Sequence, residues 1–185
     1  MPKKQITPIV IHTKLWDNYV KEVNFYGTWI IKVKLEEKDI LYRLLQLALY
    51  DGSYYIDNII NNQGIFEYKY FEDYFLDETR DKYFIKYNGK LAGFVLINEN
   101  NKFNSQGKTI AEFLILPPYR RKHLGKEAAI KAFELYPGNW EVQTMENNPI
   151  AYSFWNNVIS VYTKGHYVTR NDGIENIFIF NNEVK

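Results

Sequence analysis

Residues 112–126 read EFLILPPYRRKHLGK, and this stretch does more than any other to decide the fold. The apolar run at residues 109–116 has the length of a buried strand, and Pro117-Pro118 bounds it. A short basic turn follows, and a helix is expected from about residue 124 to 135. Free backbone N–H groups and the positive end of that helix therefore face the place where the strand ends. The sequence predicts an anion-binding turn there.

Side chains of the turn add to this prediction. Arg120, Arg121, Lys122 and Lys126 supply donors for an anion, and Gly125 lets the backbone come close to a bulky ligand such as a pyrophosphate. The spacing matches neither the G-x-x-x-x-G-K-[ST] pattern of a P-loop nor the G-x-G-x-x-G dinucleotide fingerprint. Binding of nucleoside triphosphates or dinucleotides is therefore disfavoured.

Outward from this stretch, the hydrophobic pattern predicts alternating elements. Besides the run before the turn, strands are expected at residues 28–35, 83–87, 91–98, 140–145, 161–169 and 174–180. Asn88-Gly89 is a strong hairpin signal. Helices are expected at residues 36–50 and from Pro149 onward, with Asn148 as a cap, and residues 51–81 read as an irregular acidic helical region. This order predicts an α+β fold class around a mixed sheet.

Composition limits the function classes. The 185 residues carry 23 Lys and Arg against 22 Asp and Glu, a formal net charge of +1, which disfavours a nucleic-acid binder that neutralises phosphates over its whole surface. The absence of cysteine excludes a disulfide scaffold, a thiolate metal site and a cysteine nucleophile. Only three scattered histidines occur, so no metal is expected. With neither a signal peptide nor a membrane span in the sequence, we expect a cytoplasmic protein.

One domain over residues 1–185 is expected, with an N-terminal extension at residues 1–27 and a core at residues 28–181. The extension would cover an acceptor site or form a homodimer contact. No linker or repeat divides the chain.

The residues of the turn resemble those of a known family. The run YRRKHLGK at residues 119–126 is similar to the acetyl-coenzyme A pyrophosphate loop of the GNAT N-acetyltransferase superfamily, whose pattern is [QR]-x-x-G-x-[GA]. Arg120 matches the first position and Gly125 the last. His123 stands where the family usually has glycine, which leaves room for a different loop conformation.

Two further stretches carry the same resemblance. Residues 83–98 resemble the hairpin of the family's second and third strands. NPIAYSFW at residues 148–155 resembles its second motif, N-x-x-A-x-x-[LF]-[YW]. The order of the expected elements from residue 28 to residue 180 matches as well.

The resemblance implies that an acetyl group moves from acetyl-coenzyme A, as cosubstrate, to an amine by direct attack in a ternary complex. It also implies a mostly antiparallel sheet that splays between its fourth and fifth strands, with the pantetheine arm in the gap. Backbone groups would pair with that arm like an added strand, and one N–H would polarise the thioester carbonyl. The coenzyme A residues implied are Leu114, Ile115, Leu116, Arg120, Arg121, Lys122, His123, Leu124, Gly125, Lys126, Asn148 and Trp155.

Two residues are candidates for proton transfer. Glu112 resembles the glutamate that some family members use to deprotonate an ammonium acceptor; the alternative is a strand-edge carboxylate satisfied by a neighbouring lysine. A tyrosine of the second motif often protonates the departing thiolate, but this position holds Trp155. Tyr152, turned by about 60° from Trp155 on a helix, is the candidate acid, and water is the alternative.

The acceptor side falls, by the same resemblance, on residues 36–81. Within residues 51–81, eight acidic residues stand against two basic ones, and the many aromatic residues would suit a small cationic amine by steering and cation–π contact. Asp51, Ser53, Glu72 and Asp73 are the predicted ligands. The alternative is that the acids form a solvated face while the aromatic residues pack inward.

Four candidate functions follow from these features, in order of preference. A small-molecule N-acetyltransferase comes first, and acetylation of a protein or peptide amine comes second. A non-catalytic acyl-coenzyme A binding module is the third, because Trp155 and His123 depart from the family. A basic-loop RNA-binding domain is the fourth and is disfavoured, because the aromatic residues gather in an acidic region.

Overall fold

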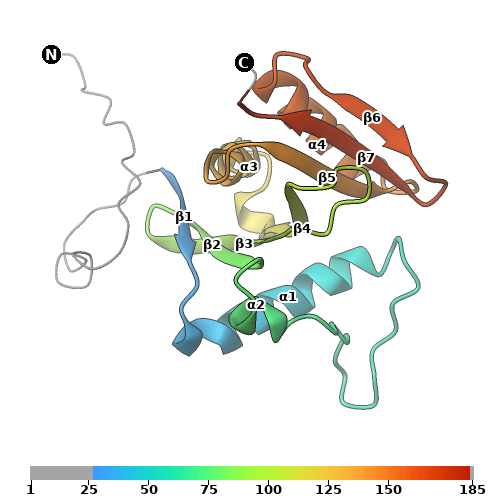
Figure 1. Cartoon of the computed structure of the whole chain (residues 1–185). Coiled ribbons are helices and arrows are strands. Elements are labelled where there is room, and N and C mark those ends of the chain that lie inside the picture. Colours follow the sequence, from blue (N-terminus) through green and yellow to red (C-terminus); the bar gives the residue numbers. More distant parts are fainter. Residues whose placement is uncertain (1–26, 184–185) are drawn as a thin grey trace, which may run out of the picture.

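The computed structural model of the chain describes residues 27–183, and within them seven strands form one sheet (Figure 1). The strands are β1 (Thr28–Lys32), β2 (Asp81–Tyr87), β3 (Lys90–Asn98), β4 (Lys108–Ile115), β5 (Asn139–Met145), β6 (Val168–Asn171) and β7 (Glu175–Asn181). Their order is β1-β2-β3-β4-β5-β7-β6, and only the β4–β5 pair is parallel. The predicted α+β class with a mixed, mostly antiparallel sheet is confirmed.

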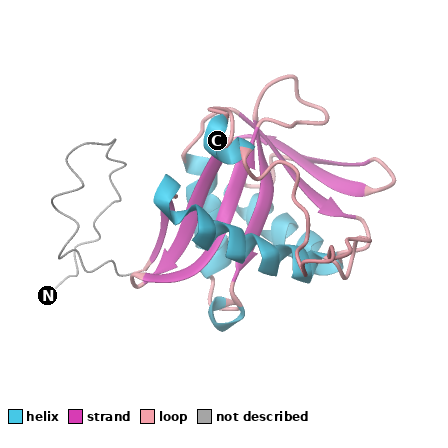
Figure 2. Ribbon diagram, turned by 90° about the horizontal axis from the view of Figure 1, so that it is seen from below, coloured by secondary structure: helices cyan, strands magenta, loops and turns pink. Residues whose placement is uncertain are grey.

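Helices cover both faces of this sheet (Figure 2). They are α1 (Lys38–Gly52), α2 (Asp73–Leu76), α3 (Leu124–Glu134) and α4 (Pro149–Tyr162), with short 3-10 turns at η1 (Leu35–Glu37) and η2 (Pro117–Tyr119). Apolar residues of α3 and α4 pack in one cluster with Val95 and Ile97 of β3. Residues of α1 and α2 pack in another with Phe94 and Leu96. Since β3 is buried on both faces, its sequence is a continuous apolar run.

Local sequence signals explain the turns and caps. Asn88 and Gly89 between β2 and β3 have φ of 48° and 76°, the left-handed conformation that a two-residue hairpin turn requires. The Asn148 Oδ1 accepts the Ala151 N–H at 2.9 Å, and Pro149 occupies the first turn of α4. The predicted hairpin and helix start are both confirmed.

The strand expected at residues 161–169 is largely wrong. Helix α4 continues through Tyr162, because Val158, Ile159 and Tyr162 keep the helical spacing and face the same core cluster. The chain leaves the helix in a turn and pairs again only in the short, exposed edge strand β6. The sheet therefore ends in a narrow β6–β7 hairpin.

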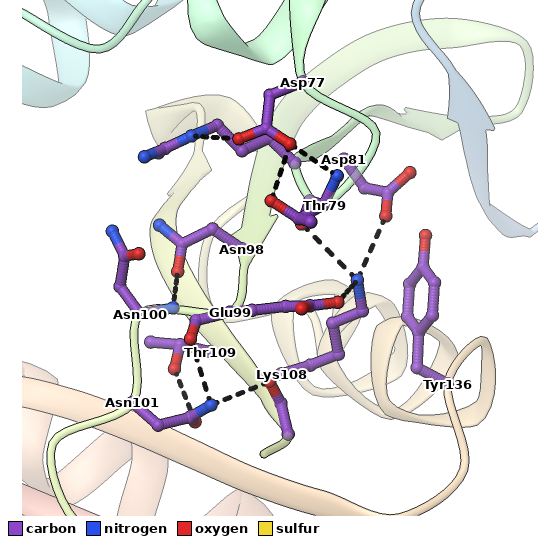
Figure 3. Close-up of polar contacts among 12 residues, drawn as sticks. Asp77, Thr79, Asp81, Asn98, Glu99, Asn100, Asn101, Lys108, Thr109 and Tyr136 are labelled. Carbon is purple, nitrogen blue, oxygen red and sulfur yellow. Dashed lines mark hydrogen bonds and ion pairs between the residues drawn. The ribbon is translucent and has the colours of Figure 1, made fainter. Parts of the chain in front are cut away.

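Polar contacts fix the end of the sheet where β4 begins. The buried carboxylate of Glu141 on β5 accepts the backbone N–H groups of Lys102, Phe103 and Asn104 at 2.7, 2.9 and 2.7 Å. Beside it, Lys108 Nζ lies 2.9 Å from Glu99 Oε1 and 3.6 Å from Asp81 Oδ2 (Figure 3). These contacts hold the β3–β4 loop and keep β4 and β5 together at this end.

Candidate active site

The pairing of β4 with β5 is short. Lys108–Ile110 pairs with Trp140–Val142, and beyond this β5 continues with β7 while β4 continues with β3. From residue 111 to residue 115, the edge of β4 that faces β5 has no strand partner within the described chain. The sheet opens where a splay between the fourth and fifth strands is expected.

A β-bulge marks the start of this opening. Leu96 pairs with Glu112 while Ile97 pairs with Ile110, so Ala111 is an extra residue on β4. Ile110 packs with α3 and α4. If side chains alternated strictly along β4 after Ile110, the Glu112 side chain would point toward the same two helices. With the extra residue, Glu112 lies opposite Leu96 on the α1 side instead. The bulge thus turns this carboxyl group toward the face that α1 and α2 cover.

The Tyr68 side chain lies near Glu112 on that face and favours its ionised form. Burial raises the pKa of Glu112 to about 7, and the hydrogen bond from Tyr68 opposes the rise. A carboxyl group that titrates near neutral pH can both accept and release a proton at that pH. A pKa of about 7 is compatible with a general base, and the role of Glu112 as base stays a prediction.

Backbone groups of β4 line the open edge. The Leu116 N–H donates to the Ala92 carbonyl at 2.8 Å. The backbone groups of Leu116 and, two residues earlier, of Leu114 therefore face β3 and form hydrogen bonds with it. The alternate residues Phe113 and Ile115 direct their backbone groups to the open side. Of the predicted residues Leu114, Ile115 and Leu116, only Ile115 faces the opening, and Phe113, which the sequence analysis did not include, joins it.

Arg120 lies at the mouth of this opening. Its Nε donates to the Ile115 carbonyl at 2.7 Å, and its guanidinium forms an ion pair with Asp51 at the end of α1. On the other side of the opening, the Asn147 Nδ2 donates to the Tyr55 carbonyl at 2.9 Å. The end of α1 and the segment that follows it thus contact the turns after β4 and β5, respectively.

The basic turn has an unusual backbone. Arg121 and His123 both have a positive φ, 59° and 63°, and His123 is the residue before the first turn of α3. Arg121, Lys122 and His123 are exposed, whereas Leu124 is buried and anchors the helix. Lys122 Nζ donates to the Pro118 carbonyl at 2.8 Å. The turn therefore presents basic groups and the free N–H groups of the helix to the same side.

Replacing His123 with glycine is expected to raise the free energy of unfolding by about 1 kcal/mol, because a side chain disfavours the left-handed conformation. Urea titration of the two proteins measures the difference. Lys164→Gly is the matched control, since Lys164 has a φ of 54° far from the turn, and it should show a similar gain. A less stable His123→Gly protein would show that contacts of the imidazole outweigh the strain.

Gly125 has a packing role as well as its predicted place beside a ligand. A Cβ atom on it would lie 3.2 Å from the Phe154 ring and 3.4 Å from the Ile115 side chain. Glycine at this position lets α3 approach α4 and β4 closely.

The two candidate residues of α4 lie on the other face of the sheet. Trp155 is buried against Phe113, with ring centroids 5.1 Å apart, and Tyr152 packs against Phe178 at 5.2 Å. Both belong to the α3–α4 cluster, whereas Glu112 lies on the α1 side of β4, so the opening between β4 and β5 lies between them. Tyr152 as a proton donor stays a prediction. Because the Asn148 Oδ1 caps α4, its Nδ2 is the group left for a ligand.

The predicted acceptor ligands already have protein partners. Asp51 pairs with Arg120, and Ser53 donates to the Tyr50 carbonyl at 2.8 Å. Glu72 pairs with Lys38, and Asp73 lies 4.0 Å from Arg80 Nε. None of these contacts involves Glu112. Asp51, Ser53, Glu72 and Asp73 stay predictions. Tyr68 is one of the many aromatic residues that the sequence analysis expects on the acceptor side, and no sequence signal distinguishes it from the others.

Two further features concern residues 27–183. Within this range, no group of three or more His, Cys, Asp and Glu side chains is placed to hold a metal ion. No helix in the same range has both the length and the apolar character needed to cross a membrane. The sequence-based expectations for residues 1–26 lie outside the described residues.

Comparison with known proteins gives one family. Residues 42–158 match the model of the acetyltransferase (GNAT) family. An acetyltransferase from Thermus thermophilus superposes with a TM-score of 0.63 at 13% identity, over 86% of this chain and 99% of that one. No curated protein sequence matches the chain significantly.

Two further solved structures were determined with coenzyme A. The spermidine N-acetyltransferase of Vibrio cholerae, in complex with coenzyme A and spermine, has a TM-score of 0.60 at 10% identity and covers 85% and 96% of the two chains. The PaiA N-acetyltransferase of Thermoplasma acidophilum, in complex with coenzyme A, has a TM-score of 0.54 at 14% identity and covers 84% and 99%. At sequence identities this low, the similarity to these structures shows a shared fold.

Proposed function

This chain belongs to the acetyltransferase (GNAT) family, and on that premise we propose that it transfers the acetyl group of acetyl-coenzyme A to an amine of a small, cationic molecule. One observation carries the proposal: the unpaired edge of β4 and the carboxyl group of Glu112 begin at the same bulge. A strand edge that can pair with an extended ligand therefore lies directly beside a group that can take up a proton.

The residues around the opening fit coenzyme A. Phe113 and Ile115 would pair with the amide groups of the pantetheine arm, which are spaced like those of a peptide. The exposed basic groups of the turn and the N–H groups at the start of α3 would hold the pyrophosphate. The Asn148 Nδ2 would donate to the arm from the other side of the opening.

The proposed reaction is a direct attack in a ternary complex. Glu112 takes a proton from the acceptor ammonium, which frees the nitrogen lone pair for attack on the thioester carbonyl carbon. A C–N bond forms, and the C–S bond breaks with its electron pair on sulfur. The thiolate takes up a proton from Tyr152 or from water, and the nitrogen releases its surplus proton to that same donor, which leaves a neutral amide and a thiol. A backbone N–H at the open edge stabilises the developing oxyanion. The protein thus positions the two substrates next to each other and supplies one base.

A cationic acceptor fits the surroundings of Glu112. Tyr68 is only partly buried on the same side of the sheet, so its aromatic ring and hydroxyl group can contact an ammonium group beside the carboxyl group. Four of the matched structures are of the Vibrio cholerae spermidine N-acetyltransferase or its variants, and spermidine is itself a small cationic amine. A small primary amine is therefore the acceptor class that we propose.

Replacing Asp51 with asparagine is expected to tighten coenzyme A binding by about two- to fivefold at low salt, because exposed ion pairs contribute about 0.2–1 kcal/mol and Arg120 would no longer be shared. Calorimetric titration at two ionic strengths measures this, and the gain should shrink at high salt. Asp57→Asn removes the same charge from the same segment and should change the affinity less. Weaker binding by Asp51→Asn would show instead that Asp51 holds Arg120 in place for the ligand.

The proposed function is tested by calorimetric titration of the protein with acetyl-coenzyme A, followed by thiol release with a panel of amines and lysine peptides. Binding with thiol release on small cationic amines supports the proposal. Release only with peptides favours a protein acetyltransferase, and binding without release on any amine favours a non-catalytic module. Absence of binding would overturn the proposal.

A further inference from the structure

Three buried polar side-chain atoms, on β5 or on the loop that β5 holds, have neither a hydrogen-bond nor an ion-pair partner among residues 27–183. They are Asn104 Nδ2, Gln143 Nε2 and Thr144 Oγ1. Gln143 and Thr144 directly follow the last pair that β5 forms with β4. Asn104 belongs to the β3–β4 loop, and its backbone N–H donates to Glu141 on β5. A buried polar group without a partner is rare and destabilises the fold, unless a bound molecule supplies the partner.

Gln143 lies on the same side of the sheet as Glu112. From Asn139 to Met145, β5 pairs with β7 without a bulge, so its side chains alternate strictly. Val142 packs in the α3–α4 cluster, and Gln143 therefore lies on the α1 side. Across the opening, the bulge at Ala111 turns Glu112 to the α1 side as well. Neighbouring strands lie about 4.8 Å apart, so the amide and the carboxyl group flank the start of the opening.

The unpartnered atom of Gln143 is a donor. An amide N–H cannot bind an ammonium group, because both are donors; it needs an oxygen atom with a lone pair, such as that of a hydroxyl or carbonyl group. Asn104 Nδ2 is a donor too, and Glu141, which holds its loop, shares the face of Gln143. The β5 side of the opening thus presents donors, opposite the proton acceptor that we propose on β4.

The Gln143 amide is free to adapt to a ligand. Its side chain as a whole is only partly buried, and no hydrogen bond from the described part of the chain fixes the amide. Rotation about the last bond of the side chain exchanges the nitrogen and oxygen atoms with little change of shape. The N–H groups can therefore turn toward a molecule in the opening.

We propose that Gln143 determines the choice of acceptor: its amide donates a hydrogen bond to an oxygen atom of the acceptor, while Glu112 faces the amino group. This inference rests on the proposed function and names its substrate class more closely. The spacing of about 5 Å between the strands is spanned by an amine whose oxygen lies two or three carbon atoms from the nitrogen. Amino alcohols and amides of amino acids have this form. An alkylamine of the same size leaves the amide without a partner and is the poorer substrate.

The test is thiol release with matched pairs of amines. 2-Aminoethanol is compared with propylamine, 3-aminopropanol with butylamine, and glycinamide with isobutylamine, so that each pair differs in oxygen-bearing groups and little in size. By kcat/KM, the wild type should prefer the oxygen-bearing member of at least one pair by about tenfold or more. In Gln143→Met, which has a similar length and no donor, this preference should fall about tenfold. Testing both proteins with the same amines cancels the difference in basicity between the amines.

The stability of the variants is an independent readout. Methionine replaces an unpartnered donor with an apolar group of similar size, so the Tm of Gln143→Met without ligand should stay or rise. Gln143→Leu, with a different shape, separates a packing fault from the loss of a hydrogen bond. Gln106→Met is the matched control, because it makes the same change at an exposed position of the β3–β4 loop. It should alter neither the preference nor the Tm.

A decrease in kcat/KM of Gln143→Met that is equal for both members of every pair would overturn the inference, because the amide would then act on the thioester or on the fold. A lower Tm in both Gln143→Met and Gln143→Leu would also overturn it, because the amide would have a partner within the protein. If the wild type releases thiol with small amines but treats the members of every pair alike, this inference fails and the proposed function stands. If it releases thiol with no amine or peptide, the proposed function itself fails.

Discussion

Replacement of Glu112 with glutamine is expected to lower kcat/KM at pH 7.5 by about 10²- to 10⁴-fold, the usual contribution of a general base. Glutamine keeps the size of the side chain and its contact with Tyr68, but it cannot take up the proton of an ammonium group. The wild-type profile should rise with pH to a plateau above about 7, the pKa to which burial raises Glu112. In Glu112→Gln, the rate should instead follow the ionisation of the amine itself and approach the wild-type rate only at high pH.

The stability of Glu112→Gln should not fall with its activity. The pKa of Glu112 in the folded protein, about 7, lies above its ordinary value of 4.5, so the folded state binds the proton more tightly. The stability from this group is fully present below about pH 4.5 and is lost as the pH rises through about 7. Glu112→Gln removes this loss and should be at least as stable as the wild type at pH 8. An inactive but stable variant excludes unfolding as the cause.

Glu134→Gln, at the exposed end of α3, is the matched control and should leave both the rate and its pH dependence unchanged. A pH profile of Glu112→Gln that is parallel to the wild-type profile at every pH would contradict the role of Glu112 as base. The binding of acetyl-coenzyme A, measured in the same samples, should be unaffected in both variants.

Replacement of Gly93 with alanine is expected to destabilise the protein by at least about 3 kcal/mol, or to prevent folding, because the new methyl group cannot be placed. An ideal Cβ on Gly93 would lie 1.9 Å from the carbonyl oxygen of Leu114 and 3.2 Å from the Cα of Ile115. Both are backbone atoms of β4, so relief requires a shift of the whole strand. At this chain length, the loss corresponds to a decrease in Tm of about 6–12 °C.

Gly52→Ala is the control for this prediction. A Cβ at Gly52, at the end of α1, meets no atom within 4 Å. Alanine there should keep or raise the stability, by up to about 1 kcal/mol. Thermal unfolding of both variants measures the contrast, and a Gly93→Ala protein with the wild-type Tm would refute the close approach of β3 and β4.

Much of the fold follows from local sequence. The Asn88-Gly89 turn, the Asn148 cap and the basic turn after β4 all act through residues a few positions apart, which a sequence pattern can represent. The strand expected at residues 161–169 failed for a related reason: β-branched residues there fit a strand and a helix alike, and the packing of α4 against the core decided for the helix.

What the sequence determined by itself is the family resemblance, the order of most elements and the choice of Glu112 as the candidate base. The tertiary structure alone decided that Phe113 and Ile115 face the opening, because that depends on the register of β4 against β3 and on the bulge at Ala111. Only the tertiary structure brings Tyr68 near Glu112 and pairs Asp51 with Arg120. Such pairs are far apart in the chain, and only the free energy of packing the whole core brings them together.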